Sequence, residues 1–321
     1  MLLFVYAVLV FLVLRFSVTL FNFLSNPKIG YYGKHFTEQV SVIVLTSLAE
    51  NDVEELLFSV ENQDYQYTEV IVQQGESIPE LVNRATGRYL LFTSSGVTLQ
   101  NGLINSLIYR TKVFNLGVLS LIPTYKAFGF IEKCLYPLSD FLLLNLLPLR
   151  LIRLSGLPAF TAGNSDCLFF DSATYKRYNW HERLNGKFPE AIEIIKMVKQ
   201  QQLKAEVLLA NKFIYHRIDL KDMAGFSRSL LQTFSDSNLA MLMYLALVIV
   251  GPVVVVLFSL NPALAVLLFG LIFLTRVMIA FLTAQSPILN VLLHPIQMAM
   301  LFVLLLGGGW ERAKESIKRK K

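Results

Sequence analysis

The sequence predicts an α/β protein in which a Rossmann-like sheet follows an N-terminal anchor helix and precedes C-terminal transmembrane helices. Three observations predict this class. Residues 1–24 are almost uninterruptedly apolar, and three further apolar segments follow residue 238. Between them, short apolar runs alternate with stretches whose apolar residues recur at helical spacing. With 54% hydrophobic residues and a mean hydropathy of +0.52, the chain is too apolar for an ordinary soluble domain, which indicates membrane insertion.

The charge and the cysteines exclude several function classes. The formal net charge is +6, and part of it lies in the basic tail, residues 309–321. Such a tail suits the cytoplasm and an anionic lipid surface, and no basic motif interleaved with aromatic residues indicates nucleic-acid binding. Cys134 and Cys167 lie in apolar runs without disulfide or metal-ligand spacing, so we expect buried thiols.

The N-terminal segment, residues 1–24, has the length that a bilayer requires and ends at polar, turn-forming residues 25–27. A cleaved signal peptide is the competing interpretation. The apolar region is too long for one, and it lacks a basic n-region and a small-residue cleavage site. We therefore interpret the segment as a membrane anchor.

The soluble part begins with a strand at residues 41–45, a helix at residues 51–61 and a strand at residues 69–72. Short connections between them imply a right-handed parallel unit, whose ligands bind beyond the carboxyl ends of the strands. Candidate binding residues therefore follow these strands: Glu50 after the first, Gln73 and Gln74 after the second. The remaining predicted elements are helices over residues 78–85, 99–114 and 220–234, and strands over 117–122, 167–170 and 204–209, the last an edge strand.

Residues 128–154 combine long apolar stretches with two prolines, Asp140, and two arginines, Arg150 and Arg153. The stretch is too interrupted for a confident span. One interpretation is a pair of helices on the membrane surface, with the arginines near phosphate headgroups. The other is a buried core helix.

The C-terminal apolar segments, residues 239–260, 263–282 and 288–306, belong to a transmembrane region at residues 239–308. Arg276 interrupts the second and should point into the helix bundle or toward an interface. A cytoplasmic domain and a cytoplasmic tail require an even number of crossings after the domain. We therefore assign residues 288–306, which a His-Pro pair interrupts, to a re-entrant or interfacial hairpin; a tail on the far side is the alternative.

One block, residues 157–201, carries the most specific pattern. It contains a small-residue loop at 161–165, a strand at 167–170, a helix capped by Asp171 or Ser172, the triplet at 180–182 and a helix starting near Pro189. The block resembles the acceptor and catalytic-base region of membrane-bound family 2 glycosyltransferases of the GT-A fold, closest to the bacterial branch that includes carotenoid glycosyltransferases. The pattern of that family reads small-small-Asn-Gly-Gln, strand, helix, Trp-His-Glu, then Glu-Asp at a helix start.

The resemblance covers most of the chain and implies a GT-A mixed sheet with helices on both faces, spanning residues 39–235. It implies transfer of a sugar from a nucleotide-sugar donor to a lipid-like acceptor. It also implies an integral protein of a bacterial inner membrane, in contact with membrane lipid, with its globular domain in the cytoplasm.

On the donor side, the resemblance places Glu50, Gln73, Gln74, Ser94 and Gly96 at the binding positions. Family members carry an Asp pair where Gln73 and Gln74 stand, and an amide cannot form the charge-assisted bond of a carboxylate. They carry Asp-x-Asp, which holds Mg²⁺ or Mn²⁺ on the diphosphate, where Ser94 and Gly96 stand. A hydroxyl and a hydrogen cannot replace two carboxylates, so we predict no metal and no cofactor.

On the acceptor side, the family's catalytic Asp corresponds to Ala191. Glu190 and His181 are the candidate substitutes for this base, although Glu190 equally suits a helix-dipole role and His181 a structural hydrogen bond. Asn164, Asp166 and Glu182 are candidates for the acceptor pocket, against the alternative that the small-residue loop only packs under a helix.

Two functions follow from these residues. The first is a membrane glycosyltransferase that is catalytically impaired or independent of metal. The second is a non-catalytic pseudo-glycosyltransferase that stabilises an active relative or presents a lipid substrate, because fold alone does not fix activity.

Overall fold

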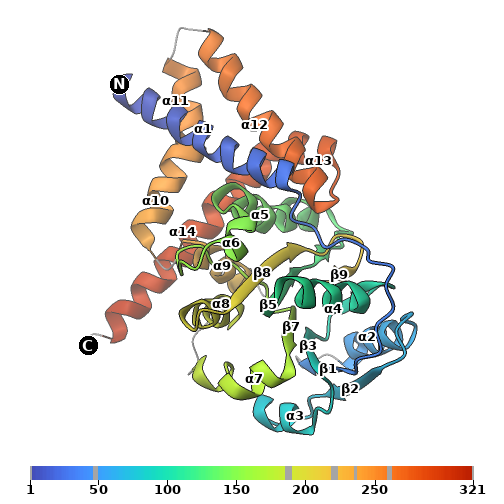
Figure 1. Cartoon of the computed structure of the whole chain (residues 1–321). Helices are drawn as coiled ribbons and strands as arrows, with labels where there is room; N and C mark the ends of the chain where they lie inside the picture. The colour runs from blue at the N-terminus through green and yellow to red at the C-terminus, as the bar shows by residue number, and fades with distance from the viewer. Residues whose placement is uncertain are drawn as a thin grey trace. The chain divides into compact units, whose positions relative to one another are not determined.

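The computed structural model describes residues 2–45, 50–184, 190–217, 223–234, 237–258 and 262–319. The chain divides into two compact units (Figure 1). The sheet unit comprises Pro27–Lys126 and Leu149–Ile218, and the helical unit comprises Met1–Asn26, Ala127–Pro148 and Asp219–Lys321. Glu50 begins a helix, but its side chain lies outside the described part, as do residues 46–49.

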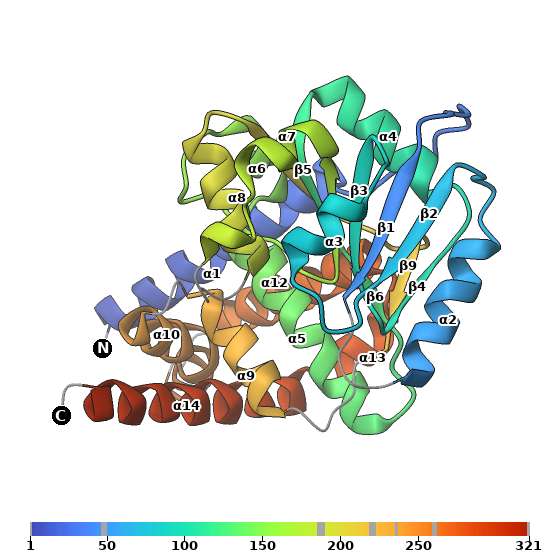
Figure 2. The ribbon, with the colours of Figure 1, turned by 90° about the horizontal axis from the view of Figure 1, so that it is seen from below.

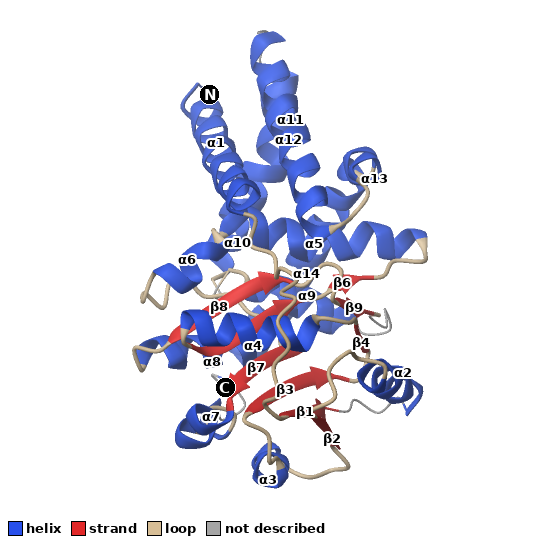
Figure 3. Cartoon of the chain, turned by 45° about the vertical axis from the view of Figure 1, so that its right-hand side comes forward, coloured by secondary structure: helices blue, strands red, loops and turns tan. Residues whose placement is uncertain are grey.

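The sheet unit is built on a mixed six-stranded sheet, shown as red arrows in Figure 3. Its strand order is β2 (Thr68–Val72), β1 (Val40–Leu45), β3 (Tyr89–Ser94), β7 (Cys167–Asp171), β5 (Leu116–Ile122), β8 (Lys204–Leu209). Only β7 runs antiparallel to its neighbours in this sheet. The predicted parallel pairing of β1 with β2 is confirmed, and so is the predicted position of β8 at the edge of the sheet.

A second sheet of three short strands was not predicted. It is formed by β4 (Val97–Leu99), β9 (Ile214–His216) and β6 (Thr124–Tyr125), in that order. Its central strand pairs with segments about a hundred residues earlier in the chain. This sheet matters for the site because β4 begins one residue after Gly96.

Helices lie on both faces of the main sheet, as the fold class predicts. They are α2 (Glu50–Glu61), α3 (Ile78–Arg84), α4 (Leu103–Phe114), α6 (Leu149–Leu154), α7 (Ser172–Tyr178) and α8 (Glu190–Gln200). The α2 and α4 helices share one apolar cluster with the side chains of one sheet face, and Figure 2 shows α2 beside β4. The α8 helix packs on β5 and β8 through buried Ile194, Ile195 and Val198, which lie outside that cluster.

The helical unit contains the apolar helices. They are α1 (Leu2–Ser25), α5 (Phe130–Leu146), α9 (Met223–Gln232), α10 (Asn238–Leu245), α11 (Gly251–Phe258), α12 (Pro262–Thr283), α13 (Pro287–Leu292) and α14 (His294–Arg319). A π-helical segment, Ala246–Val250, joins α10 to α11. Three segments of the described chain are long and apolar enough to cross a membrane: Leu3–Ser25, Asn238–Phe258 and Pro262–Thr283. They indicate membrane association.

The third C-terminal apolar segment is not among these candidate spans. It is divided at Leu293 between α13 and α14, and α14 continues without a break to Arg319. The helix break therefore falls immediately before His294, and no turn follows within the rest of the segment. Two of the candidate spans found in the described residues follow the sheet unit in the sequence, and the side of the membrane on which the tail lies stays a prediction.

Residues 128–154 contain two helices, α5 and α6, which belong to different units, and their placement on a membrane surface stays a prediction. The α5 helix lies in the helical unit and buries ten of its residues, among them Cys134 and Asp140, whereas α6 belongs to the sheet unit. For α5, this packing is that of a core helix.

Candidate functional site

The carboxyl ends of β1, β2 and β3 meet at one edge of the main sheet. Leu45 pairs with Ser94, and Val44 pairs with both Val72 and Thr93. Because β7 is antiparallel, its beginning lies at the same edge, where Cys167 pairs with Thr93. The described residues that follow β2 and β3 and those that precede β7 therefore converge there.

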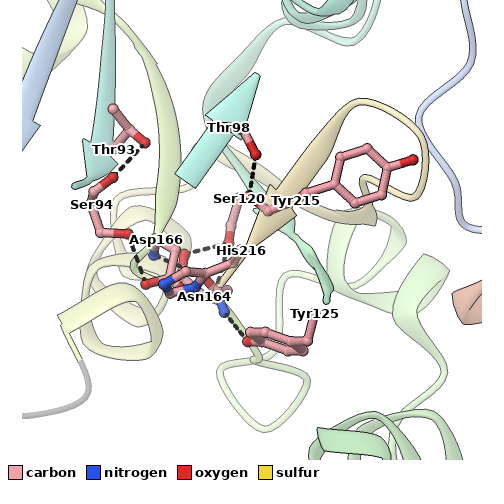
Figure 4. A network of polar contacts seen from close by, with 9 residues as sticks. All are labelled: Thr93, Ser94, Thr98, Ser120, Tyr125, Asn164, Asp166, Tyr215 and His216. Atoms are coloured by element: carbon pink, nitrogen blue, oxygen red, sulfur yellow. Dashed lines mark hydrogen bonds and ion pairs between the residues drawn. The ribbon is translucent and has the colours of Figure 1, made fainter. Parts of the chain in front are cut away.

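Asp166 meets Ser94 at this edge, as Figure 4 shows. The Ser94 hydroxyl donates to Asp166 Oδ1 at 3.2 Å, and the Ser94 backbone N–H donates to the Asp166 carbonyl at 3.2 Å. A carboxylate thus lies beside the position from which the family's first metal ligand would project. The sequence assigned Asp166 to the acceptor side, and in the structure its carboxylate contacts Ser94, which the sequence assigned to the donor side.

His216 completes this cluster, and no sequence pattern indicated it. Its Nδ1 lies 2.9 Å from Asp166 Oδ2, and about a quarter of the Asp166 side chain is exposed. The β9 strand brings it there because Val97, at the start of β4, pairs with His216. Burial alone would raise the pKa of Asp166, but His216 and the Ser94 hydroxyl hold that pKa below its ordinary value.

Gly96 is in direct contact with the His216 ring. A Cβ atom added at Gly96 would lie 3.0 Å from His216 Nε2 and 3.2 Å from the Arg217 carbonyl oxygen. These approaches are tight, so a side chain at this position would require the His216 ring to shift by a few tenths of an ångström. The imidazole therefore lies against the position of the Cβ atom that the second residue of an Asp-x-Asp motif would carry.

Asn164 is fixed in the loop before β7 by four hydrogen bonds. Its backbone N–H donates to Ser120 Oγ at 2.9 Å, and the same hydroxyl donates to the Asn164 carbonyl at 3.1 Å. Its side chain donates to the Tyr125 hydroxyl at 3.1 Å and accepts from the Asp166 N–H at 2.7 Å. The loop thus holds the Asp166 carboxylate in a defined orientation (Figure 4).

Ala191, the position of the family's base, lies inside a contact between this loop and α8. It is fully buried, and a Cβ added at Gly163 would lie 2.9 Å from both Ala191 Cβ and Ile195 Cδ1. The Ser165 hydroxyl accepts a hydrogen bond from the Ala191 N–H at 3.2 Å and so caps the start of α8. Beside it, Glu190 is half-buried, and burial raises the pKa of its carboxyl group.

His181 lies in an aromatic core. Its Nδ1 is 2.5 Å from the Tyr175 hydroxyl, and its ring is 4.9 Å from that of Phe92. Burial lowers the pKa of His181 to about 4, so the ring is neutral near pH 7. Its Nε2 is buried and has no hydrogen-bond partner among the described residues. This environment suits a His181 that forms a structural hydrogen bond rather than one that acts as a base. Glu182, the next residue, is exposed.

Gln73 and Gln74 form the turn after β2. The Gln73 side chain donates to the Glu76 carbonyl at 2.9 Å, and the Gln74 N–H donates to the Glu76 carboxylate at 2.6 Å. Gly75 has a φ of +102°, which L side chains rarely adopt. The Gln73 amide is therefore engaged in closing the turn.

The backbone resembles that of a mannosyltransferase from Pyrobaculum calidifontis solved with GDP-Man and Mn²⁺, at 14% identity and a TM-score of 0.51. The alignment covers 96% of this chain and 99% of that chain. The fold is that of a glycosyltransferase. Staphylococcus aureus TarS, solved with UDP, matches at 16% identity and a TM-score of 0.37, over 88% of this chain and 92% of that chain, which is too distant to add to this conclusion. No family model and no curated protein matches the sequence.

The resemblance described from the sequence implies a divalent cation on the residues at the positions of Ser94 and Gly96. The donors beside Ser94 and Gly96 are one carboxylate, Asp166, and one imidazole, His216, which are bonded to each other. In the described residues, no three His, Cys, Asp or Glu side chains converge as metal ligands. A hard cation that prefers several oxygen ligands does not fit this donor set, and the absence of a metal stays a prediction.

Proposed function

We propose that the chain is a family 2 glycosyltransferase that moves a sugar from a nucleotide-sugar donor to a lipid-like acceptor without a divalent cation. The observation that carries the proposal is the Asp166–His216 pair beside Gly96, at the carboxyl edge of the sheet. Sugar transfer leaves a nucleoside diphosphate, whose developing charge requires a cation or hydrogen-bond donors. An ionised carboxylate 2.9 Å from Nδ1 stabilises positive charge on the His216 ring. In this proposal, the His216 ring supplies the positive charge that a bound metal ion supplies in the resembled family.

The membrane helices support a lipid-like acceptor. Three candidate spans belong to the same chain as the site, so an acceptor dissolved in the bilayer meets an enzyme confined to that bilayer. We place the protein in a bacterial inner membrane, with the sheet unit and the basic tail in the cytoplasm.

Nucleotide binding tests the role of His216. Full-length protein in detergent is titrated with UDP and with GDP, in EDTA and in Mn²⁺, by calorimetry. We expect binding in EDTA, and we expect His216→Gln to weaken it at least about tenfold, since one charge-assisted hydrogen bond contributes about 1.5–3 kcal/mol. His35→Gln, an exposed histidine of the same unit, is the matched control. A wild-type affinity that rises tenfold or more with Mn²⁺ would refute a metal-independent site.

The second candidate is a non-catalytic partner of an active glycosyltransferase. It is favoured by Ala191, because the position of the catalytic base is filled by the contact with Gly163. It predicts no binding of UDP or GDP at millimolar concentration. The same titration therefore separates the two functions.

A further inference from the structure

One loop of the sheet unit exposes apolar side chains. It follows α6 and comprises residues 154–160, which we call the apolar loop. Leu154 is 67% exposed and Leu157 is 60% exposed, and the sequence between Arg153 and Asp166 contains no charged residue. Apolar side chains gathered on an exposed loop indicate a surface that contacts an apolar phase or a partner.

Lys199 on α8 holds the backbone of the apolar loop. The residue is 5% exposed, and its Nζ donates to the carbonyl oxygens of Ser155 at 3.0 Å, Leu157 at 3.3 Å and Phe160 at 2.5 Å. One buried ammonium group therefore supplies a donor to three backbone acceptors of the loop. The Leu157 side chain remains exposed while its carbonyl group is bonded to the protein interior.

The apolar loop also satisfies further backbone groups by itself. The Leu157 N–H donates to the Ser155 hydroxyl at 3.2 Å, and the Phe160 N–H donates to the Leu157 carbonyl at 3.1 Å. The Pro158 carbonyl accepts from the Thr161 hydroxyl at 3.0 Å, and a proline has no N–H to satisfy. Backbone groups that already have partners cost little to transfer from water into a membrane interface.

Arg153, the residue before the apolar loop, adds a positive charge. Its Nε lies 2.9 Å from Glu206 Oε1, but Arg110 already donates two hydrogen bonds to that carboxylate. Among the described residues, no other acid forms an ion pair with Arg153. Its side chain is 19% exposed, so part of it reaches the surface beside the apolar side chains.

We propose that the apolar loop binds the surface of the lipid bilayer, with Leu154 and Leu157 at the acyl chains nearest the headgroups and Arg153 at the phosphate groups of anionic lipids. A cation beside exposed apolar side chains suits this interface, where anionic headgroups meet acyl chains. The occupant is a bilayer because the chain has candidate spans, and only Leu147 and Pro148 separate α6 from α5 of the unit that contains them. The inference goes beyond the proposed function, since this contact requires neither nucleotide nor acceptor.

A fluorescent label on the loop tests the contact. Full-length Leu157→Cys protein is labelled with an NBD maleimide and placed in nanodiscs of phosphatidylcholine and phosphatidylglycerol; Cys134 and Cys167 are buried, and labelled wild type measures any reaction at them. Phe58→Cys, at a residue of α2 that is 68% exposed, is the matched control. We expect blue-shifted emission, and quenching by a lipid with a nitroxide on its acyl chain, at position 157 and not at position 58. Equal quenching at both positions, or none at position 157, overturns the proposal.

The same label tests the role of the charge. A basic residue near an anionic membrane surface favours the bound state about fivefold, so Arg153→Gln should lower the ratio of bound to unbound loop by about that factor. Arg153→Lys keeps the charge and should keep most of the quenching. Arg177→Gln, at an exposed arginine on α7, is the control for a change in net charge. Unchanged quenching in an Arg153→Gln protein whose Tm matches wild type, or equal quenching of wild type in nanodiscs of phosphatidylcholine alone, overturns the proposal.

Discussion

Replacing Glu206 with glutamine tests how the edge of the main sheet is stabilised. Glu206 on β8 is fully buried, and Arg110 donates two hydrogen bonds of 2.7 Å to its carboxylate. Arg150 and Arg153 lie within 3.3 and 2.9 Å of the same group. Glutamine keeps the shape of the side chain and removes the only negative charge among these four groups. Removing one member of a buried ion pair costs about 3–5 kcal/mol.

The expected effect lies near the lower end of that range. Arg150 and Arg153 are about a fifth exposed, so water offsets part of their repulsion, whereas Arg110 is 8% exposed and loses its partner. We therefore expect about 3 kcal/mol, which for a unit of this size lowers Tm by about 6–12 °C.

Tryptophan fluorescence measures this unfolding in the full-length protein. The chain has two tryptophans, the fully buried Trp180 of the sheet unit and the exposed Trp310 of the helical unit. A Trp310→Phe background leaves Trp180 as the reporter. Glu193→Gln is the control, because its ion pair with Lys196 is partly exposed and should contribute less than about 1 kcal/mol. A Tm within about 2 °C of the parent for Glu206→Gln would refute the reasoning.

Two further predictions concern the site. Asp166→Asn should destabilise the sheet unit by about 1 kcal/mol at pH 7, a small effect because about a quarter of the side chain is exposed. Folding lowers the pKa of Asp166, so the ionised carboxylate stabilises the fold above the ordinary pKa of an aspartate, and this stabilisation is lost as pH falls through the folded-state pKa. The difference in unfolding free energy between Asp166→Asn and wild type, measured by urea unfolding, should therefore be smaller at pH 3 than at pH 7. Ala191→Asp should yield no turnover of nucleotide sugar, because the new carboxylate would enter the contact with Gly163. Sugar release by that variant, detected by chromatography of the products, would contradict this prediction.

Local patterns predicted most of the main sheet. Residues 41–45 and 69–72 are runs in which β-branched residues predominate, and they became adjacent parallel strands. The cap at Asp171 was also readable, since its side chain accepts from the Thr174 N–H at 2.9 Å. These features depend on residues close together in the sequence, and such features are the ones that sequence reasoning recovers well.

The second sheet and His216 could not be predicted in the same way. The β9 strand has three residues, too few for a periodic pattern, and it is defined by pairing with β4 more than a hundred residues away. Asn164, Asp166, Ser94 and Gly96 were all identified as site residues from the resemblance. Their grouping with His216 required the antiparallel direction of β7 and the β4–β9 pair, neither of which the local sequence specifies.

The resemblance places Ser94 and Gly96 where family members carry aspartates, and in the structure both residues lie against the Asp166–His216 pair. With glycine at 96, the imidazole ring fits against the backbone, whereas an added Cβ would already be 3.0 Å from its Nε2. With serine at 94, a hydroxyl donates to Asp166, whereas a carboxylate at that position would repel the Asp166 carboxylate. An Asp-x-Asp motif would therefore crowd the Asp166–His216 pair, through the Cβ atom at position 96 and a second carboxylate at position 94. At this edge of the sheet, the Asp166 carboxylate and the His216 imidazole stand beside the positions at which the resembled family carries two carboxylates, so the edge keeps a polar character.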